Sequence, residues 1–487
     1  MAELGLEYAG HLPGLDLAEV EWRTLSFAAW GDTLDVRVPV LTEAQSTALA
    51  QRVRDNARSY LKTLRTDEIV AILDRAIACL LDRENPWRRK MERLLPIVTG
   101  YHPEMVRLGL SGYLRSFRTP QLQRFLGEDF ANPAVLDGFQ PAMKGGLVRA
   151  CGPQLLLHIW AGNVPGLPLW SLVSGLLVKA GTIGKVPSAE PLFASWFAQL
   201  LAEIDPQLAE CLAVVWWKGG DADAETVWLH EADTVLAYGG NDALAAIRQR
   251  VPVTTRFLPH GHKIGFAMVS GVALDTRKSG PLARLVAHDV TRWEQQGCYS
   301  PQMLYVERGG RVTPREFAGL VAHELAGFAQ RQPRRALSMA EATSLASWRN
   351  AQEMRAFADP GSGLIGDPAD SWSVAYSDRP QPLAPSALNR TLAIVAIDSL
   401  DEVAALVAPA RAFLQTAGIA ASPEDLMRLA GPLAEAGVTR ITALGSMAAP
   451  EAGWHHDGRF NLLDLVTIAE IEQAAETAAE GFAPYVD

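Results

Sequence analysis

The sequence predicts an α/β protein built around a parallel sheet with helices on both faces. From residue 146 onward, short apolar segments alternate with helical segments of roughly 10 to 15 residues. Strands that are joined through helices run parallel and bury both faces of their sheet. The 48% hydrophobic and 20% charged residues are typical of a globular chain. In such sheets, ligands bind beyond the carboxyl ends of the strands.

The elements follow in order along the chain. Residues 1–140 are predicted to be mainly helical, with helices at 42–65 and 67–83, where apolar residues recur at helical spacing. Strands are then predicted at 147–151, 155–160, 182–186, 212–217, 234–237, 254–258 and 264–270, with helices between them. A second α/β region begins near residue 273, with helices at 282–294, 314–330 and 339–357, strands at 302–306 and 391–397, a loop at 361–378 and a late strand at 440–444.

Charge and composition exclude several functions. The 44 basic and 55 acidic residues give a net charge of −11, which disfavours nucleic-acid binding. The long apolar stretch at 155–178 has no charged residue but contains Pro165 and Pro168, so we expect no membrane span. The first residues form no apolar leader and the cysteines form no CxxC pair, so we expect a cytoplasmic protein. Three of the four cysteines are expected to be structural: Cys79, Cys151 and Cys211.

Two motifs are rejected. The string from Gly361 to Gly366 matches GxGxxG, but an Asp-Pro pair lies on either side of it, where a phosphate loop needs a strand and a helix. The pairs at 260/262 and 455/456 offer histidines, but no third ligand follows at a useful spacing, so no metal site is predicted.

Three segments carry chemistry. Asn163 lies at a strand-to-helix turn, where its amide either stabilises the turn or donates to a developing oxyanion. Lys185 ends a short buried strand, where a cofactor would cross the sheet edge, unless it is an ordinary loop lysine. Cys298 follows a Gln-Gln-Gly sequence on a loop between a helix and a strand. A loop thiol suits nucleophilic acyl transfer.

Taken together, these segments resemble the aldehyde dehydrogenase superfamily. Asn163 matches its oxyanion-binding asparagine, Lys185 its cofactor-ribose lysine, and Cys298 its nucleophile. Gly239 and Gly240 occupy the place of its turn beside the cofactor phosphates. More closely, the chain resembles the LuxC family of acyl-CoA reductases, through the segments 293–302 (WEQQGCYSPQ), 390–395 and 453–465.

The resemblance implies an aldehyde-dehydrogenase-like fold with a Rossmann-type cofactor domain, an α/β catalytic domain and a helical N-terminal region. We expect boundaries at 1–140 for the helical region, 141–272 for the dinucleotide-binding domain and 273–430 for the catalytic domain. Residues 431–487 are expected to pack back on the cofactor domain. The resemblance also implies a fatty acyl-CoA or acyl-protein thioester as substrate, homo-oligomers, and a complex with acyl-transferring subunits.

Two departures from the superfamily pattern refine the expected activity. Hydrolytic members carry a glutamate that activates water, but Pro259 stands at or next to its place, so no carboxylate is expected at the site and acyl reduction is favoured. This leaves the proton donor unassigned, and His260 and His262 are the candidates for it. Ser188 stands where NAD-preferring relatives have a glutamate, and its hydroxyl can donate to a 2′-phosphate, which favours NADP(H) despite the nearby Glu190.

The predicted activity is reduction of an acyl thioester to the aldehyde through an S-acyl cysteine. Three alternatives remain open: a hydrolytic NAD(P)-dependent aldehyde dehydrogenase, a Cys/His acyltransferase or thioesterase using Cys298 with His260, His262 or His288, and a non-catalytic scaffold.

Overall fold

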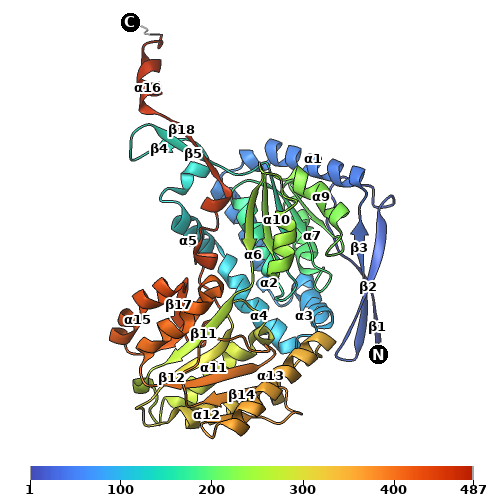
Figure 1. The fold of residues 1–487 in the computed structure, drawn as a ribbon. Helices are drawn as coiled ribbons and strands as arrows, with labels where there is room; N and C mark the ends of the chain where they lie inside the picture. The colour runs from blue at the N-terminus through green and yellow to red at the C-terminus, as the bar shows by residue number, and fades with distance from the viewer. Residues whose placement is uncertain (1, 485–487) are drawn as a thin grey trace.

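Two sheets organise the chain in the computed structural model, which describes residues 2–484. In Figure 1 a five-stranded sheet forms the centre of the upper body and a seven-stranded sheet the centre of the lower body. A three-stranded sheet at the N-terminal end lies to the right of the upper body, and a narrow arm ending in α16 projects from its top (Figure 1). This is the predicted α/β architecture.

The five-stranded sheet is entirely parallel, in the order β10-β9-β6-β7-β8. Its strands are β6 (Leu155–Ile159), β7 (Gly181–Lys185), β8 (Leu212–Val215), β9 (Thr234–Tyr238) and β10 (Arg256–His260). The chain adds β7 and β8 on one side of β6, and then returns to add β9 and β10 on the other side. The carboxyl ends of β6 and β9 therefore flank the switch point, where ligands bind in sheets of this kind.

Helices cover both faces of this sheet. The connecting helices are α6 (Leu167–Leu177), α7 (Phe193–Ile204), α8 (Pro206–Ala209), α9 (Ala222–Glu231) and α10 (Asn241–Arg248). The helices before the sheet are α1 (Glu43–Ser59), α2 (Thr66–Leu81), α3 (Pro86–Thr99), α4 (Pro103–Leu114) and α5 (Thr119–Asp129). The predicted helices at 42–65 and 67–83 are thus confirmed.

The seven-stranded sheet has the order β13-β14-β15-β12-β11-β16-β17, and β13 is its antiparallel strand. The strands are β11 (Ile264–Val269), β12 (Pro301–Glu307), β13 (Ser362–Ile365), β14 (Ser373–Ser377), β15 (Thr391–Ile397), β16 (Leu414–Ala420) and β17 (Arg440–Ala443). Its helices are α11 (Ser279–Thr291), α12 (Pro314–Arg331), α13 (Met339–Ala358), α14 (Val403–Val407) and α15 (Pro423–Ala436).

The loop predicted at 361–378 is wrong in part, because it contains β13 and β14. The string from Gly361 to Gly366 forms β13, which pairs with β14, and no helix follows it. It therefore has neither neighbour that a phosphate loop needs.

The N-terminal segment also differs from the prediction. Residues 2–40, expected within a helical region, form β1 (Ala2–Tyr8), β2 (Glu21–Ala29) and β3 (Asp32–Val40). Leu34, Val36 and Val38 alternate as buried residues along β3, which is the period of a strand. Trp30 and Gly31 both have positive φ, 56° and 88°, as a two-residue hairpin turn requires.

The arm joins segments from opposite ends of the chain. Strand β18 (Thr467–Ile471) pairs antiparallel with β5 (Leu147–Cys151), which pairs with β4 (Gln140–Pro141), and α16 (Gln473–Glu480) follows. Cys151, expected in the core, is exposed here. The predicted domain boundaries stay a prediction.

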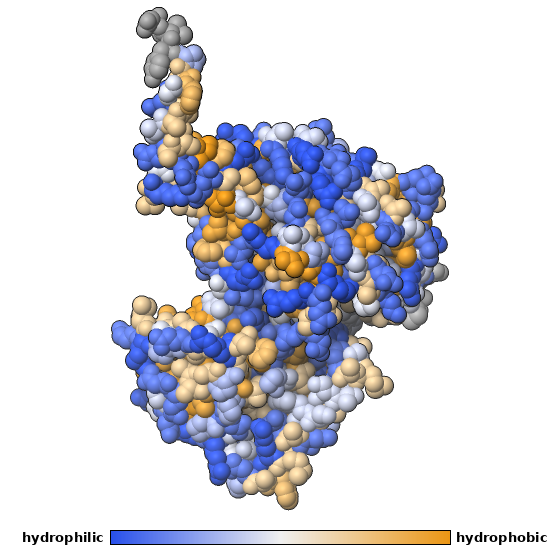
Figure 2. Space-filling view, turned by 45° about the horizontal axis from the view of Figure 1, so that its top comes forward, coloured by the Kyte–Doolittle hydropathy of each residue, from blue (hydrophilic) through white to orange (hydrophobic). Residues whose placement is uncertain are grey.

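The surface is predominantly hydrophilic on the face in Figure 2, and hydrophobic residues gather where the arm meets the upper body. Across residues 2–484, no helix combines the length and the apolar character needed to cross a bilayer.

Packing between β6 and β7 yields a stability prediction. A Cβ at Gly184 would lie 1.8 Å from the buried Trp160 ring, whose Nε1 donates to Ser171 Oγ at 2.7 Å. We expect Gly184→Ala to lower the free energy of unfolding by ~1–3 kcal/mol through overpacking, measured by chemical denaturation. Gly219→Ala is the matched control, because no atom lies within 4 Å of its added Cβ. Equal denaturation midpoints for the two variants would contradict this packing.

Candidate active site

A cavity of about 420 Å³ lies between the carboxyl edge of the five-stranded sheet and the amino edge of the seven-stranded sheet. Six of the eight predicted site residues line it: Asn163, Gly239, Gly240, His260, His262 and Cys298. Lys185 and Ser188 lie outside its lining, on and after β7, whose carboxyl end belongs to the same sheet edge.

The loop before Cys298 has an unusual backbone. Trp293, Glu294 and Gln295 have positive φ values of 48°, 51° and 60°. Non-glycine residues in this region are strained and persist only when their surroundings fix them. The fixing contact is a buried ion pair, in which Arg390 Nε and Nη2 donate to the Glu294 carboxylate at 2.6 and 2.9 Å. Both side chains are fully buried.

The side chain of Gln295 fixes the same loop to two strands. Its Nε2 donates to the carbonyl oxygens of Pro301 and Thr391, each at 2.8 Å, and its Oε1 accepts from Thr391 N at 2.9 Å. Pro301 begins β12 and Thr391 begins β15, so the loop is held at the amino edge of the sheet.

Cys298 lies in the cavity wall as a hydrogen-bonded thiol. Gln415 Nε2, on β16, donates to its sulfur at 3.3 Å. Burial raises the pKa of the Cys298 thiol to about 11, and the negative charge of Asp457 adds to the rise. The resting group is therefore neutral at pH 7.

Asp457 brings a carboxylate into the cavity from the C-terminal segment. Its two oxygens accept from Gln415 Nε2 at 2.7 Å and from His260 Nδ1 at 2.8 Å. Burial opposes the charge, but the hydrogen bond from His260 and the neighbouring histidines hold the pKa of Asp457 well below its usual range. The expectation that the site lacks a carboxylate is therefore wrong, although this one is a weak base.

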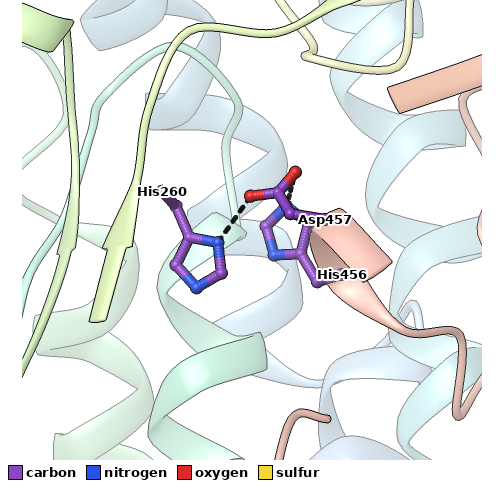
Figure 3. A group of neighbouring side chains, drawn as sticks. All are labelled: His260, His456 and Asp457. Atoms are coloured by element: carbon purple, nitrogen blue, oxygen red, sulfur yellow. Dashed lines mark hydrogen bonds and ion pairs between the residues drawn. The ribbon is translucent and has the colours of Figure 1, made fainter. Parts of the chain in front are cut away.

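His260 is oriented from three sides. Its ring stacks on Tyr238 and on His456, with centroid distances of 4.8 and 4.4 Å. Figure 3 shows its Nδ1 directed at Asp457, so Nδ1 carries the proton and Nε2 is left for another partner. Of the two predicted proton donors, His260 is thus held in place, whereas His262 is exposed.

The cluster of His260, His456 and Asp457 could in principle hold a cation, since their ligand atoms lie within 4.8 Å of one another. The imidazole planes are nearly parallel, at 9°. Ring nitrogens bind metals through lone pairs in the ring plane, so stacked rings do not converge on one ion. We therefore assign the cluster to orientation of His260.

Asn163 follows β6 and is exposed. Its Nδ2 donates to Gln296 O at 2.6 Å, and its backbone oxygen accepts from the Tyr101 hydroxyl at 2.6 Å. An amide NH₂ carries two hydrogens. One holds the cysteine loop, and the other is available to an oxyanion.

The side chain of Lys185 has no polar partner among the described residues. The residue is buried, and among residues 2–484 its ammonium forms no hydrogen bond and no ion pair. Its Nζ lies 5.8 Å from the centre of the Trp217 ring, and burial lowers its pKa. An unpaired buried ammonium is costly, so a polar group is expected beside it.

Ser188 and Glu190 follow Lys185 and face different surroundings. Ser188 is exposed, and its Oγ accepts from Trp216 Nε1 at 3.0 Å. Glu190 is buried and accepts from the backbone N–H groups of Leu192 and Phe193 at the start of α7. Burial raises the pKa of Glu190 to about 7. The carboxylate that could have opposed a 2′-phosphate is therefore turned into the fold.

The sequence predictions missed Gln415 and Asp457. Asp457 lies within the His-His-Asp string of the segment 453–465, and that string was the available signal. Gln415 begins a buried strand, and nothing in its neighbourhood of the sequence marks it.

Comparisons with known proteins identify the family of this chain. Residues 61–468 match the family described as acyl-CoA reductase (LuxC). The long-chain acyl-protein thioester reductase of Photorhabdus luminescens is 25% identical over 464 residues, which cover 94% of this chain and 91% of that protein.

Solved structures agree with the fold. The NADP-dependent glyceraldehyde-3-phosphate dehydrogenase of Bacillus halodurans, complexed with NADP, superposes with a TM-score of 0.70 at 13% identity, covering 93% of this chain and 96% of that one. A mutant aldehyde dehydrogenase C of Pseudomonas syringae, complexed with NAD+ and octanal, gives 0.71 at 14% identity, covering 98% of both chains.

The matched family extends over most of the chain, and the solved structures show the fold of aldehyde dehydrogenases. The chain therefore belongs to the acyl-CoA reductase (LuxC) family and has an aldehyde-dehydrogenase-like fold.

Proposed function

We propose that the protein reduces a long-chain fatty acyl thioester to the aldehyde, with NADPH as reductant and an S-acyl intermediate on Cys298. The observation that carries the proposal is the cavity itself. It joins a loop thiol, an amide with a free N–H and an oriented imidazole at the switch point of a parallel sheet.

The first half-reaction uses three of these groups. The Cys298 sulfur attacks the thioester carbonyl and gives up its proton to His260 Nε2. The oxyanion accepts hydrogen bonds from Asn163 Nδ2 and from the Cys298 backbone N–H. The intermediate collapses by breaking the bond to the carrier sulfur, which takes the proton from His260. Asp457 stabilises the imidazolium in between.

The second half-reaction releases the aldehyde. When bound, NADPH supplies the hydride. Asn163 again stabilises the oxyanion, and the bond between carbon and the Cys298 sulfur then breaks. One acyl thioester, one NADPH and one proton give aldehyde, free thiol and NADP⁺.

Residues on the five-stranded sheet fit a dinucleotide. The unpaired Lys185 ammonium can donate to ribose hydroxyls, and Gly239 and Gly240 leave open space at the start of α10. The exposed Ser188 hydroxyl and the inward-facing Glu190 support a preference for NADP(H).

The weak basicity of Asp457 supports reduction over hydrolysis. A carboxylate that accepts two hydrogen bonds and has a lowered pKa removes protons from water poorly. The S-acyl group would then survive until the hydride arrives.

The relative's name supports the choice of substrate, since it specifies long-chain acyl-protein thioesters. We extend this to either an acyl-protein or a CoA thioester here. The assembly that we propose is a homo-oligomer that receives acyl groups from transferring subunits.

Replacement of the nucleophile tests the mechanism. We expect Cys298→Ala to abolish the S-acyl adduct seen by mass spectrometry and to slow NADPH oxidation with acyl-CoA by at least ~10³-fold. Cys151→Ala, outside the cavity, is the control and should retain both. If the wild type releases CoA without consuming NADPH, the result would favour an acyltransferase. If it forms free acid from aldehyde and NADP⁺ in the absence of CoA, the result would favour a hydrolytic dehydrogenase.

The raised pKa of Cys298 predicts the pH dependence of its alkylation. Only the thiolate reacts with iodoacetamide, so the rate in the free enzyme should rise about tenfold per pH unit from pH 7 to 10, up to the pKa of about 11. Peptide mapping measures the rate, with Cys298→Ala as the background. A plateau near pH 7 would show that the resting enzyme already holds a thiolate.

Cofactor choice can be tested at Ser188. A carboxylate there would repel a 2′-phosphate, so Ser188→Glu should raise KM for NADPH about tenfold, equivalent to ~1.4 kcal/mol, and leave KM for NADH nearly unchanged. Ala189→Glu adds the same charge one residue later and is the control. An unaltered cofactor preference would place Ser188 away from the ribose.

A further inference from the structure

Arg292 presents an unbalanced positive charge to the cavity. It follows α11, and its guanidinium carbon lies 5.1 Å from the centre of the Trp293 ring. Within residues 2–484 it forms no hydrogen bond and no ion pair through its side chain. Burial lowers the pKa of Arg292, because a charged guanidinium loses hydration free energy when it is buried.

The acidic groups of the site are already paired. Glu294 binds Arg390, and Asp457 accepts from His260 and Gln415. Lys263, also in the cavity wall, donates to a backbone carbonyl. No described carboxylate is therefore left to balance Arg292.

Two glycines of α4 leave room around the guanidinium. A Cβ at Gly109 would lie 3.4 Å from Arg292 Nη2 and 2.3 Å from the Trp293 ring, and one at Gly112 would lie 3.9 Å from Nη2. Arg292 is thus on the α4 wall, whereas the proposed cofactor residues Gly239 and Gly240 follow β9. The α4 wall is left for the acyl donor.

A guanidinium binds carboxylates and phosphates through two parallel hydrogen bonds. Hydrocarbon packed against it would leave it without any partner. We propose that Arg292 is an anion subsite for the acyl donor, which binds an oxyanion carried by the thioester. This inference rests on the proposed function. The oxyanion is either a carboxylate on the acyl chain or a phosphate on the carrier arm.

Two matched pairs of thioesters distinguish these sources. A comparison of succinyl-CoA with butanoyl-CoA tests whether Arg292 binds a carboxylate on the acyl chain. A comparison of butanoyl-CoA with butanoyl-pantetheine tests whether Arg292 binds a phosphate on the carrier arm. We expect the wild type to prefer the anionic member of one pair by about tenfold or more in kcat/KM, equivalent to ~1.4 kcal/mol, and Arg292→Met to abolish that preference.

Three further variants and measurements complete the test. Arg292→Lys should retain part of the preference, because it keeps the charge but loses the two-bond geometry. Arg277→Met removes an exposed arginine outside the cavity and should behave as the wild type. Succinate or 4′-phosphopantetheine should raise the thermal midpoint of the wild type and leave that of Arg292→Met unchanged.

The outcomes separate the two proposals. Equal preferences in wild type and Arg292→Met for both pairs, with NADPH oxidation intact, would overturn the anion subsite alone. Failure of the wild type to reduce any thioester, a long-chain acyl-CoA included, would overturn the proposed function. The thermal midpoints would then still decide whether Arg292 binds an oxyanion.

Discussion

The buried ion pair between Glu294 and Arg390 joins the two backbone segments on which the cysteine loop depends. Glu294 is the middle residue of a left-handed run at 293–295, and Arg390 is the last residue of another at 388–390. Between the two runs, Asn389 N donates to Glu294 O at 3.0 Å. Such backbone is costly in isolation, and a buried charge is costlier still. Each segment is stable because the other one is present. Removing either charge would leave its partner unpaired in the interior, a loss of ~3–5 kcal/mol.

The position of this pair follows from the sheet order. Strands β12 and β15 are neighbours, so the loops that precede them meet at one edge. The same edge faces the carboxyl ends of the five-stranded sheet across the cavity. Tyr101, from the helical region, lies 2.6 Å from Asn163 O and 3.3 Å from Trp293 O, and so connects the two loops from a third direction. The Asn163 turn and the cysteine loop are therefore also positioned relative to each other by a residue of the helical region.

Local pattern was sufficient to predict most of the regular structure. The strand at 391–397 was predicted to the residue, because a continuous apolar run bounded by polar residues is typical of a strand buried on both faces. Strand β2 is hard to predict because much of it is exposed, and its mixture of polar and small residues obscures the alternation. In β3 the alternation of Leu34, Val36 and Val38 was an available signal. Strands β13 and β14 were missed because glycine, serine and aspartate dominate their segment.

The residues of the site likewise fall into those that the local sequence predicts and those that it does not. Asn163, Lys185 and Cys298 each follow or end an element whose boundary the sequence reveals. Asp457 and Gln415 reach the cavity only through long-range packing: Asp457 is 197 residues from the histidine that it orients. The pairing of Glu294 with Arg390 is equally non-local, across 96 residues, and no local spacing encodes it.

The burial of the Cys298 sulfur has a consequence for its oxidation. Peroxides attack thiolates, and the first product, a sulfenic acid, can be oxidised further to irreversible forms. Because burial raises the pKa of Cys298 to about 11, the group is a thiol almost all of the time at neutral pH. The protein thus keeps this cavity sulfur in the form that peroxides attack slowly.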